Sequence, residues 1–403
     1  MSLPWIIFIV LALAAAGFVL GRGRALSTSD SRLLHSLPSF HGWFVALSTA
    51  VPALLWLLAG LLALPLLAAG EGARAQGFTI VGVIAVLLSL AGLALSLKRV
   101  SSDFRARNVV ERFTLLMLIL ASTIAILTTL GIVLSMLFET MNFFSQYPWQ
   151  DFFFSLTWAP AFHGQSQLGI LPLLWGTLYI SFIALAVSVP IGLFAAIYMS
   201  EYASKPFRSV AKPLIEILAG IPTIVYGLFA LITVGPLLRD WIAQPTGLGT
   251  SGSSVMTAGL VMGIMLIPFV SSLSDDIMNA VPQSLRDGSF GLGATKSETI
   301  RQVVLPAALP GIVGAVLLAT SRAIGETMIV VLGAGAAAQM SLNPFEAMTT
   351  VTVKIVSQLT GDTDFASPET LVAFALGLTL FVMTLGLNVL ALHIVRKYRE
   401  QYE

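Results

Sequence analysis

Residues 113–138 read FTLLMLILASTIAILTTLGIVLSMLF, and this stretch contains no charged side chain. It can span a membrane, because a helix needs about 20 apolar residues to cross the hydrocarbon core of a bilayer. The whole chain has the same character: 57% of its 403 residues are hydrophobic, 10% are charged, and the mean hydropathy is +0.91. A soluble domain carries about 25% charged residues. The composition therefore indicates a polytopic, all-α membrane protein and excludes a soluble enzyme, a disordered chain and a nucleic-acid binder.

Uncharged stretches of spanning length recur along the chain. We predict nine spans, centred on Leu3–Leu20, Trp43–Leu67, Phe78–Leu97, Phe113–Phe138, Ile170–Ser200, Ile217–Leu238, Val255–Leu273, Leu305–Leu332 and Leu371–Leu392. The aromatic-rich segment 139–169 follows the fourth span, and we expect it to lie in the outer membrane interface, where aromatic rings gather.

The placement of Lys and Arg predicts the topology. Cytoplasmic loops carry an excess of basic residues. Most of the 21 Lys and Arg fall in segments 21–42, 98–112, 201–216, 275–304 and 393–403. The predicted outer segments hold only Arg74, Arg239 and Lys354, and Arg322 falls inside a predicted span. The sequence therefore predicts an outside N-terminus and a cytoplasmic C-terminus, with the first span as an uncleaved anchor.

Residue types that carry chemistry are scarce. The chain has no Cys, and its four His residues are widely scattered. Disulfides, thiol catalysis and zinc–thiolate sites are therefore excluded. We see no nucleophile–base set and no metal cluster, so we expect neither enzymatic activity nor a cofactor.

Segment 275–304 is the longest predicted cytoplasmic loop. Ser284, three residues before Asp287, predicts the N-cap of a short helix, and Gly293 suits the left-handed position that ends it. A second helix is expected from about Ser297 to Pro306. The run from Gly291 to Ser297 looks like a phosphate-cradling loop, but Thr295 stands where such a loop needs Gly before Lys, so we do not expect nucleotide binding.

The same segment resembles the coupling loop of ABC-importer permeases, whose pattern is Glu-Ala-Ala-x3-Gly-x9-Ile-x-Leu-Pro. Here Asp287-Gly288-Ser289 precedes Gly293 and then Val303-x-Leu305-Pro306, with the spacing kept throughout. The first three residues and Val303 depart from the pattern. The resemblance implies that Ser284, Asp287, Gly288, Ser289, Gly293, Leu305 and Pro306 dock into a groove of a separate ATPase subunit and transmit its closure to the spans.

Three further runs narrow the resemblance to phosphate-importer permeases of the PstC type. They are Ser188–Leu193 with Tyr198–Tyr202, Glu216–Gly227, and Ser321–Met328, which contains Arg-Ala-Ile-Gly-Glu-Thr-Met. The resemblance covers about residues 113–403. We therefore expect a six-helix type I permease core at 111–403, with its coupling loop at 275–304. Residues 1–110 would form an N-terminal extension of three spans.

The resemblance also implies partners and a location. The chain would sit in the lipid of a bacterial inner membrane beside a sister permease of the PstA type. Two copies of a PstB-type ATPase would bind ATP and power transport. A periplasmic PstS-type protein would deliver inorganic phosphate. No nucleic acid is expected as a partner.

Arg322 and Glu326 fall inside the eighth predicted span. A charge at that depth costs at least about 2.5–3.5 kcal/mol on insertion scales, so it usually has a function. At i,i+4 spacing, the two side chains would share a helix face and could pair. They would form either a structural ion pair or, as we favour, part of an anion path together with Thr327.

The type of anion can be considered from the same residues. Arg can donate two parallel hydrogen bonds to an oxyanion. Glu326 could accept a hydrogen bond from protonated phosphate, which sulfate near pH 7 cannot offer.

Other functions stay open at this point. A permease for another oxyanion would share the coupling loop, and the sister phosphate permease differs only in detail. An ion-coupled secondary transporter would need no docking loop and often shows inverted repeats, which we do not see. A membrane-anchored structural protein would leave the loop and the embedded charges unexplained.

Overall fold

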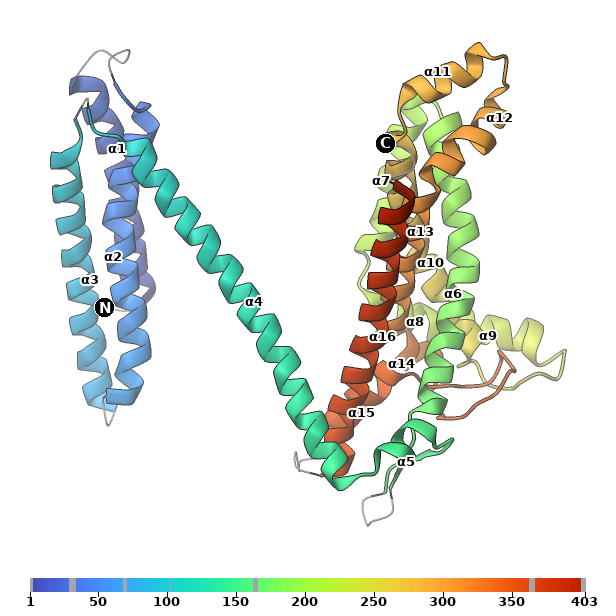
Figure 1. The fold of residues 1–403 in the computed structure, drawn as a ribbon. Coiled ribbons are helices and arrows are strands. Elements are labelled where there is room, and N and C mark those ends of the chain that lie inside the picture. The colour runs from blue at the N-terminus through green and yellow to red at the C-terminus, as the bar shows by residue number, and fades with distance from the viewer. Residues whose placement is uncertain are drawn as a thin grey trace. The chain divides into compact units, whose positions relative to one another are not determined.

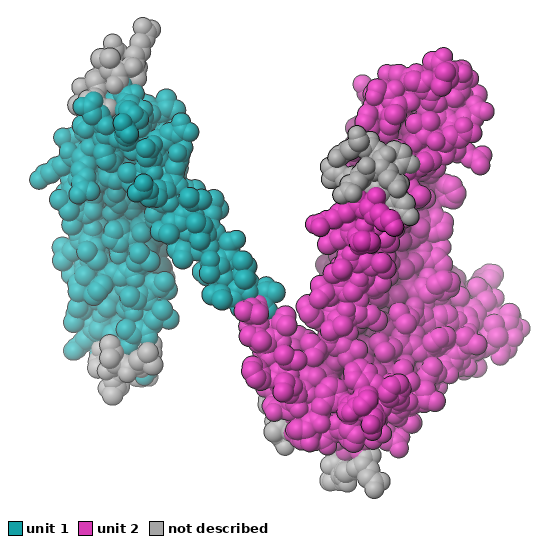
Figure 2. Space-filling model, in the orientation of Figure 1, with its two compact units in different colours: residues 1–129 teal, residues 130–403 magenta. Residues whose placement is uncertain are grey.

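The computed structural model describes residues 3–28, 34–67, 71–101, 103–161, 166–361 and 367–399. The chain divides into two compact units, residues 1–129 and 130–403 (Figure 2). Among the described residues, nine helices are long and apolar enough to cross a membrane, which confirms the predicted number.

The first unit consists of long apolar helices (Figure 1). They are α1 (Leu3–Thr28), α2 (Pro38–Leu67), α3 (Glu71–Arg99) and the start of α4 (Ala106–Gln146). Small residues let α1 and α2 approach closely, as is usual where apolar burial does not drive helix association. A Cβ atom on Gly42 would lie 2.8 Å from the carbonyl oxygen of Phe18, so a larger residue would push the helices apart.

The second unit contains the remaining elements. Its helices are α5 (Trp149–Phe154), α6 (Leu171–Ile197), α7 (Lys205–Gly220), α8 (Thr223–Phe229), α9 (Gly235–Leu238), α10 (Val255–Ala280), α11 (Gln283–Gly291), α12 (Lys296–Thr299), α13 (Leu305–Ile324), α14 (Met328–Gly333), α15 (Val351–Gly361) and α16 (Pro368–Arg399). Four π-helical turns extend or join them, at Tyr198–Tyr202, Ala230–Val234, Arg239–Ala243 and Ile300–Val304. Two short antiparallel strands, β1 (Trp158–Ala159) and β2 (Gln167–Leu168), complete it.

The core of the second unit is the packed pair α6 and α10. Its largest buried side chains include Ile180, Met262 and Leu266, with Ile329 of α14 against them. Glycines bring the two helices together: a Cβ atom on Gly259 would lie 2.7 Å from Cγ2 of Ile183. This pair is the centre of the largest buried cluster of the second unit.

The predicted sixth span is wrong at its start. Residues 205–220 form a separate amphipathic helix, α7, which the apolar pattern did not distinguish from the span that follows. The chain turns at Ile221 and Pro222, both with extended backbone, and α8 begins at Thr223. Because Pro222 lacks an N–H and precedes the first helical residue, it separates the two helices rather than bending one.

The aromatic segment is packed more tightly than an interfacial belt. Phe143 and Phe152 are fully buried and Trp158 is 7% exposed, whereas Trp149 and Phe154 remain exposed. Phe143 stacks on Tyr147 with ring centroids 5.4 Å apart. Part of this segment therefore forms a core cluster with Leu168, in which the rings pack against one another. Its location at the outer membrane interface stays a prediction.

Candidate functional site

Residues 281–304, here called the elbow, join α10 to α13 through α11 and α12. Figure 1 shows α11 and α12 at one end of the second unit, with α5 at the opposite end. Gly293 ends α11 with φ at +83°, which confirms its predicted left-handed conformation. Thr295 and Glu298 form a capping box that begins α12. From Lys296 the helix continues through Leu305 and Pro306 to Ile324.

The predicted cap at Ser284 is wrong. Pro282 occupies the N-cap of α11, and Ser284 is the second helical residue, with its side chain exposed. Asp287 lies on the same exposed surface, where its carboxylate accepts a hydrogen bond from Gln283 at 3.1 Å. The capping box in this region is Thr295-x-x-Glu298, which the sequence analysis did not consider. It fits the capping-box pattern better than Ser284-x-x-Asp287 does.

Two small residues give the elbow an open outer surface. A Cβ atom on Gly288 would meet no atom within 4 Å, so this chain does not itself require glycine there. Ser289 is half-buried, and its hydroxyl bonds to that of Thr299 at 2.9 Å, which joins α11 to α12. Leu292 is 92% exposed at the tip. The elbow is thus a rigid projection with an apolar tip, suited to docking.

Arg286 fastens the elbow to the helices beneath it. Its guanidinium donates to the carbonyl oxygens of Val281 at 2.6 Å and Met278 at 2.7 Å. It also pairs with Glu201 at 3.0 Å, and both side chains are about nine-tenths buried. The two carbonyls belong to the end of α10, which has no further helical turn to bond them. Arg286 therefore satisfies helix-end groups and ties α11 to α10 and to the end of α6.

A second polar cluster joins α10 to α7. The side chain of Asp275 is fully buried and accepts hydrogen bonds from Arg208 at 2.8 Å and Lys212 at 2.9 Å. Lys212 also reaches Asp276 at 2.8 Å, and this hydrogen bond raises the pKa of Lys212. The sequence assigned both aspartates to the loop, but they lie on the last turns of α10. Burying the charge of Asp275 costs little free energy only while its charged partners are all present.

Arg322 and Glu326 do not form the predicted pair. Helix α13 ends at Ile324, and Gly325 follows as its C-cap, so the two residues do not share a helix face. No ion pair joins them, although both lie in described parts of the chain. The guanidinium of Arg322 instead lies over the ring of Phe269, 5.3 Å from its centroid. Gly325 was the available signal, because glycine commonly ends a helix.

Glu326 and Thr327 belong to the turn that begins α14. The Oε1 atom of Glu326 accepts hydrogen bonds from the backbone N–H of Met328 at 3.0 Å and of Ile329 at 3.5 Å. Its carbonyl oxygen accepts from the hydroxyl of Thr352 at 2.9 Å. Thr327 is the N-cap residue and half-buried. The carboxylate of Glu326 therefore caps a helix, and no acidic side chain in the described parts of the chain pairs with Arg322.

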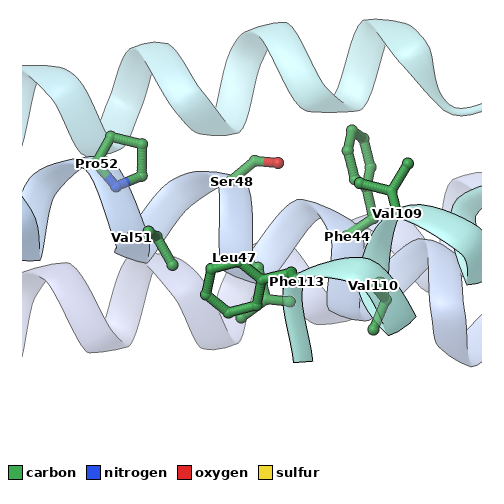
Figure 3. A pocket seen from close by; sticks show the side chains of 8 residues that line it. All are labelled: Phe44, Leu47, Ser48, Val51, Pro52, Val109, Val110 and Phe113. Carbon is green, nitrogen blue, oxygen red and sulfur yellow. The ribbon is translucent and has the colours of Figure 1, made fainter. Parts of the chain in front are cut away.

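The first unit contains a pocket of a different kind. It has a volume of about 200 Å³ and lies between α2 and the start of α4 (Figure 3). Apart from the hydroxyl of Ser48, the eight lining side chains are apolar, Phe44 and Phe113 among them. No charge lines this pocket, so it offers an anion no partner.

Two family models match this chain. Residues 188–400 match the family model "Binding-protein-dependent transport system inner membrane component". Residues 7–75 match a second model, described as "Phosphate ATP-binding cassette transporter". The second match falls within the three-helix segment that the sequence described as an extension.

Two individual relatives are similar to this chain in sequence. The chain is 36% identical over 234 residues to the probable ABC transporter permease protein YqgH of Bacillus subtilis, covering 58% of this chain and 74% of that one. It is 38% identical over 248 residues to the phosphate transport system permease protein PstC 1 of Mycobacterium tuberculosis, covering 57% and 72%.

A solved bacterial ABC transporter for the acidic polysaccharide alginate is similar in fold. Its TM-score is 0.51 at 17% identity, over 73% of this chain and 99% of that one. The family match covers more than half of the present chain and includes the elbow and both polar clusters. The chain therefore belongs to the family of binding-protein-dependent transport system inner membrane components, and it is a membrane permease subunit of an ABC importer.

Proposed function

We propose that the chain is the PstC-type permease of an ATP-driven inorganic phosphate importer and forms half of its translocation pathway. One observation carries the choice of an anion: Arg322 is a cation within an apolar span, and it has no acidic partner among the described residues. Such a charge is too costly to leave against lipid, so it faces water or a partner. A guanidinium with free donors suits a tetrahedral oxyanion.

The proposal of phosphate as the substrate rests on similarity to known proteins. The family model matched by residues 7–75 carries phosphate in its description, and several relatives are described as phosphate transport permeases. The site residues alone would fit another oxyanion, and that alternative is part of the test below. The predicted pathway contribution of Glu326 and Thr327 stays a prediction.

The proposed assembly has four kinds of subunit. A PstA-type permease would complete the pathway, and two PstB-type ATPases would bind ATP, so this chain needs no cofactor of its own. A PstS-type protein would deliver phosphate from the periplasm of a bacterium. The elbow would face the cytoplasm and dock on the ATPase through Ser284, Asp287 and Gly288, which are exposed on α11.

Reconstitution tests this function. The four proteins are placed in proteoliposomes with ATP inside, and uptake of labelled phosphate is measured with unlabelled sulfate as competitor. ATP-dependent phosphate uptake that sulfate does not reduce is expected. Preferred uptake of sulfate would favour the other-oxyanion permease. Uptake that follows an ion gradient without ATP would favour a secondary transporter.

A further inference from the structure

The two polar clusters lie on consecutive turns of one helix end. Asp275 and Met278 are one turn apart on α10, and they bond to different neighbours. Asp275 holds α7 through Arg208 and Lys212, while the carbonyl of Met278 holds the elbow through Arg286. The end of α10 is therefore shared by both attachments.

Each attachment is built from several bonds, so it resists rotation as well as separation. Arg208 donates from Nη2 to both carboxylate oxygens of Asp275, at 3.0 and 2.8 Å. Asn279 donates to Asp275 Oδ1 at 3.0 Å and accepts from Arg208 at 3.2 Å. Each of these hydrogen bonds has at least one charged partner, and such bonds are about twice as strong as neutral ones.

The connection continues from α7 into the membrane part of the unit. The buried hydroxyl of Tyr226 on α8 donates to the carbonyl oxygen of Leu218 on α7 at 2.8 Å, which bridges the break between these helices. Helix α8 lies directly against α14: a Cβ atom on Gly227 would be 2.8 Å from the carbonyl oxygen of Met328. Met328 follows the turn whose carboxylate caps α14.

We infer that Asp275 and Arg286 are positioning residues of the transport cycle, which make α11, α10, the end of α6 and α7 move as one body. Displacement of the elbow by the ATPase then displaces α7, and through Tyr226 it reaches α8 and α14. The inference rests on the proposed ATP-driven function, since it needs a partner that moves the elbow. Neither residue contacts the transported anion.

The first test measures coupling in the complete reconstituted transporter. Asp275→Asn keeps the size of the side chain but removes the charge between Arg208 and Lys212. The phosphate moved per ATP hydrolysed is expected to fall by about tenfold, while the ATPase still copurifies and hydrolyses ATP. Asp276→Asn is the matched control. That side chain is 64% exposed and forms its ion pair among the described residues with Lys212 alone, so the phosphate moved per ATP in this variant should stay within about twofold of the wild type.

The second test measures movement directly in the same complex. Because the chain has no Cys, single cysteines at Ser209 on α7 and Leu292 on the elbow can carry spin labels, and the distance between the labels is compared without nucleotide and with ATP. In the wild type, the distance distribution should be the same in both states. In Asp275→Asn it should broaden once ATP is bound.

The outcomes separate this inference from the proposed function. A wild-type label distance that changes with ATP, or an unchanged transport ratio in Asp275→Asn, would overturn the relay. If Asp275→Asn fails to assemble, the wild-type distances alone decide it. If the complex binds ATP but moves no phosphate, the proposed substrate is wrong, and the distance comparison still decides the relay.

Discussion

The separation of Arg322 from Glu326 predicts that their substitutions act independently. Glu326→Ala removes the acceptor for two backbone N–H groups at the start of α14. Losing a side-chain cap costs about 1 kcal/mol, and a hydrogen bond to a charged acceptor contributes up to about 3 kcal/mol. The free energy of unfolding should therefore fall by about 1–3 kcal/mol. Glu326→Gln keeps an acceptor oxygen and should lose less.

Arg322→Ala removes a different contact. The guanidinium lies over Phe269, and such a cation–π contact contributes about 0.5–1 kcal/mol at an exposed site. Because the two side chains share no partner in the described contacts, the double variant should equal the sum of the single variants within about 0.5 kcal/mol. The assay is SDS titration of the purified chain in lipid–detergent micelles, followed by far-ultraviolet circular dichroism.

A large coupling energy would refute this reasoning. Breaking a buried ion pair by removing one partner costs about 3–5 kcal/mol, and removing both costs much less than the sum. A coupling of about 2 kcal/mol or more would therefore mean that the pair exists, as the helical spacing alone suggested. Glu326→Gln serves a second purpose: an unchanged preference for phosphate over sulfate would remove the hypothesis that this carboxylate selects a protonated anion.

Three further predictions concern topology, packing and docking. In whole cells, a membrane-impermeant thiol reagent should label Leu342→Cys, which is 78% exposed, and should label Leu292→Cys only after permeabilisation. Gly259→Val should destabilise the chain by about 1–3 kcal/mol through overpacking, because a Cβ atom added at this position would lie 2.7 Å from Cγ2 of Ile183; the midpoint of SDS unfolding measures this. Gly288→Trp should reduce ATPase copurification without affecting the folded chain, since no atom of the described residues lies within 4 Å of a Cβ atom at this position.

Each of these has a clear contrary result. Labelling of both cysteines in intact cells would contradict the predicted orientation. If Gly259→Val left the midpoint of SDS unfolding unchanged, α6 and α10 would not be in close contact. If the ATPase copurified fully with Gly288→Trp, this surface of α11 would not contact the ATPase. Gly288→Ala is the matched control.

The sequence predicted long apolar helices well, because hydropathy reports the number of spans directly. The sequence also located the elbow. The motif from Asp287 to Pro306 has a fixed spacing because it spans the end of one helix and the start of the next. Gly293 was predicted correctly because a left-handed residue at a helix end strongly favours glycine.

The failures have different physical causes, and the first is that periodicity assumes that a helix continues. The apolar residues on both sides of Gly325 hid the end of α13, so Arg322 and Glu326 were placed on one face. Residues 205–220 were assigned to a loop and the start of a span, because an amphipathic helix averages to moderate hydropathy. The basic partners of Asp275, Arg208 and Lys212, are more than 60 residues away in the chain, and no local pattern indicates such a contact.

The central claim is that Arg322, a cation on α13 with no acidic partner in the described segments, serves the anion pathway. The most direct measurement compares the reconstituted wild type with Arg322→Ala and Arg322→Lys for assembly, ATP hydrolysis and phosphate uptake. We predict that Arg322→Ala assembles and hydrolyses ATP but takes up no phosphate, and that Arg322→Lys retains part of the uptake. Uptake by Arg322→Ala at the wild-type rate would contradict the claim and leave Arg322 with a packing role against Phe269.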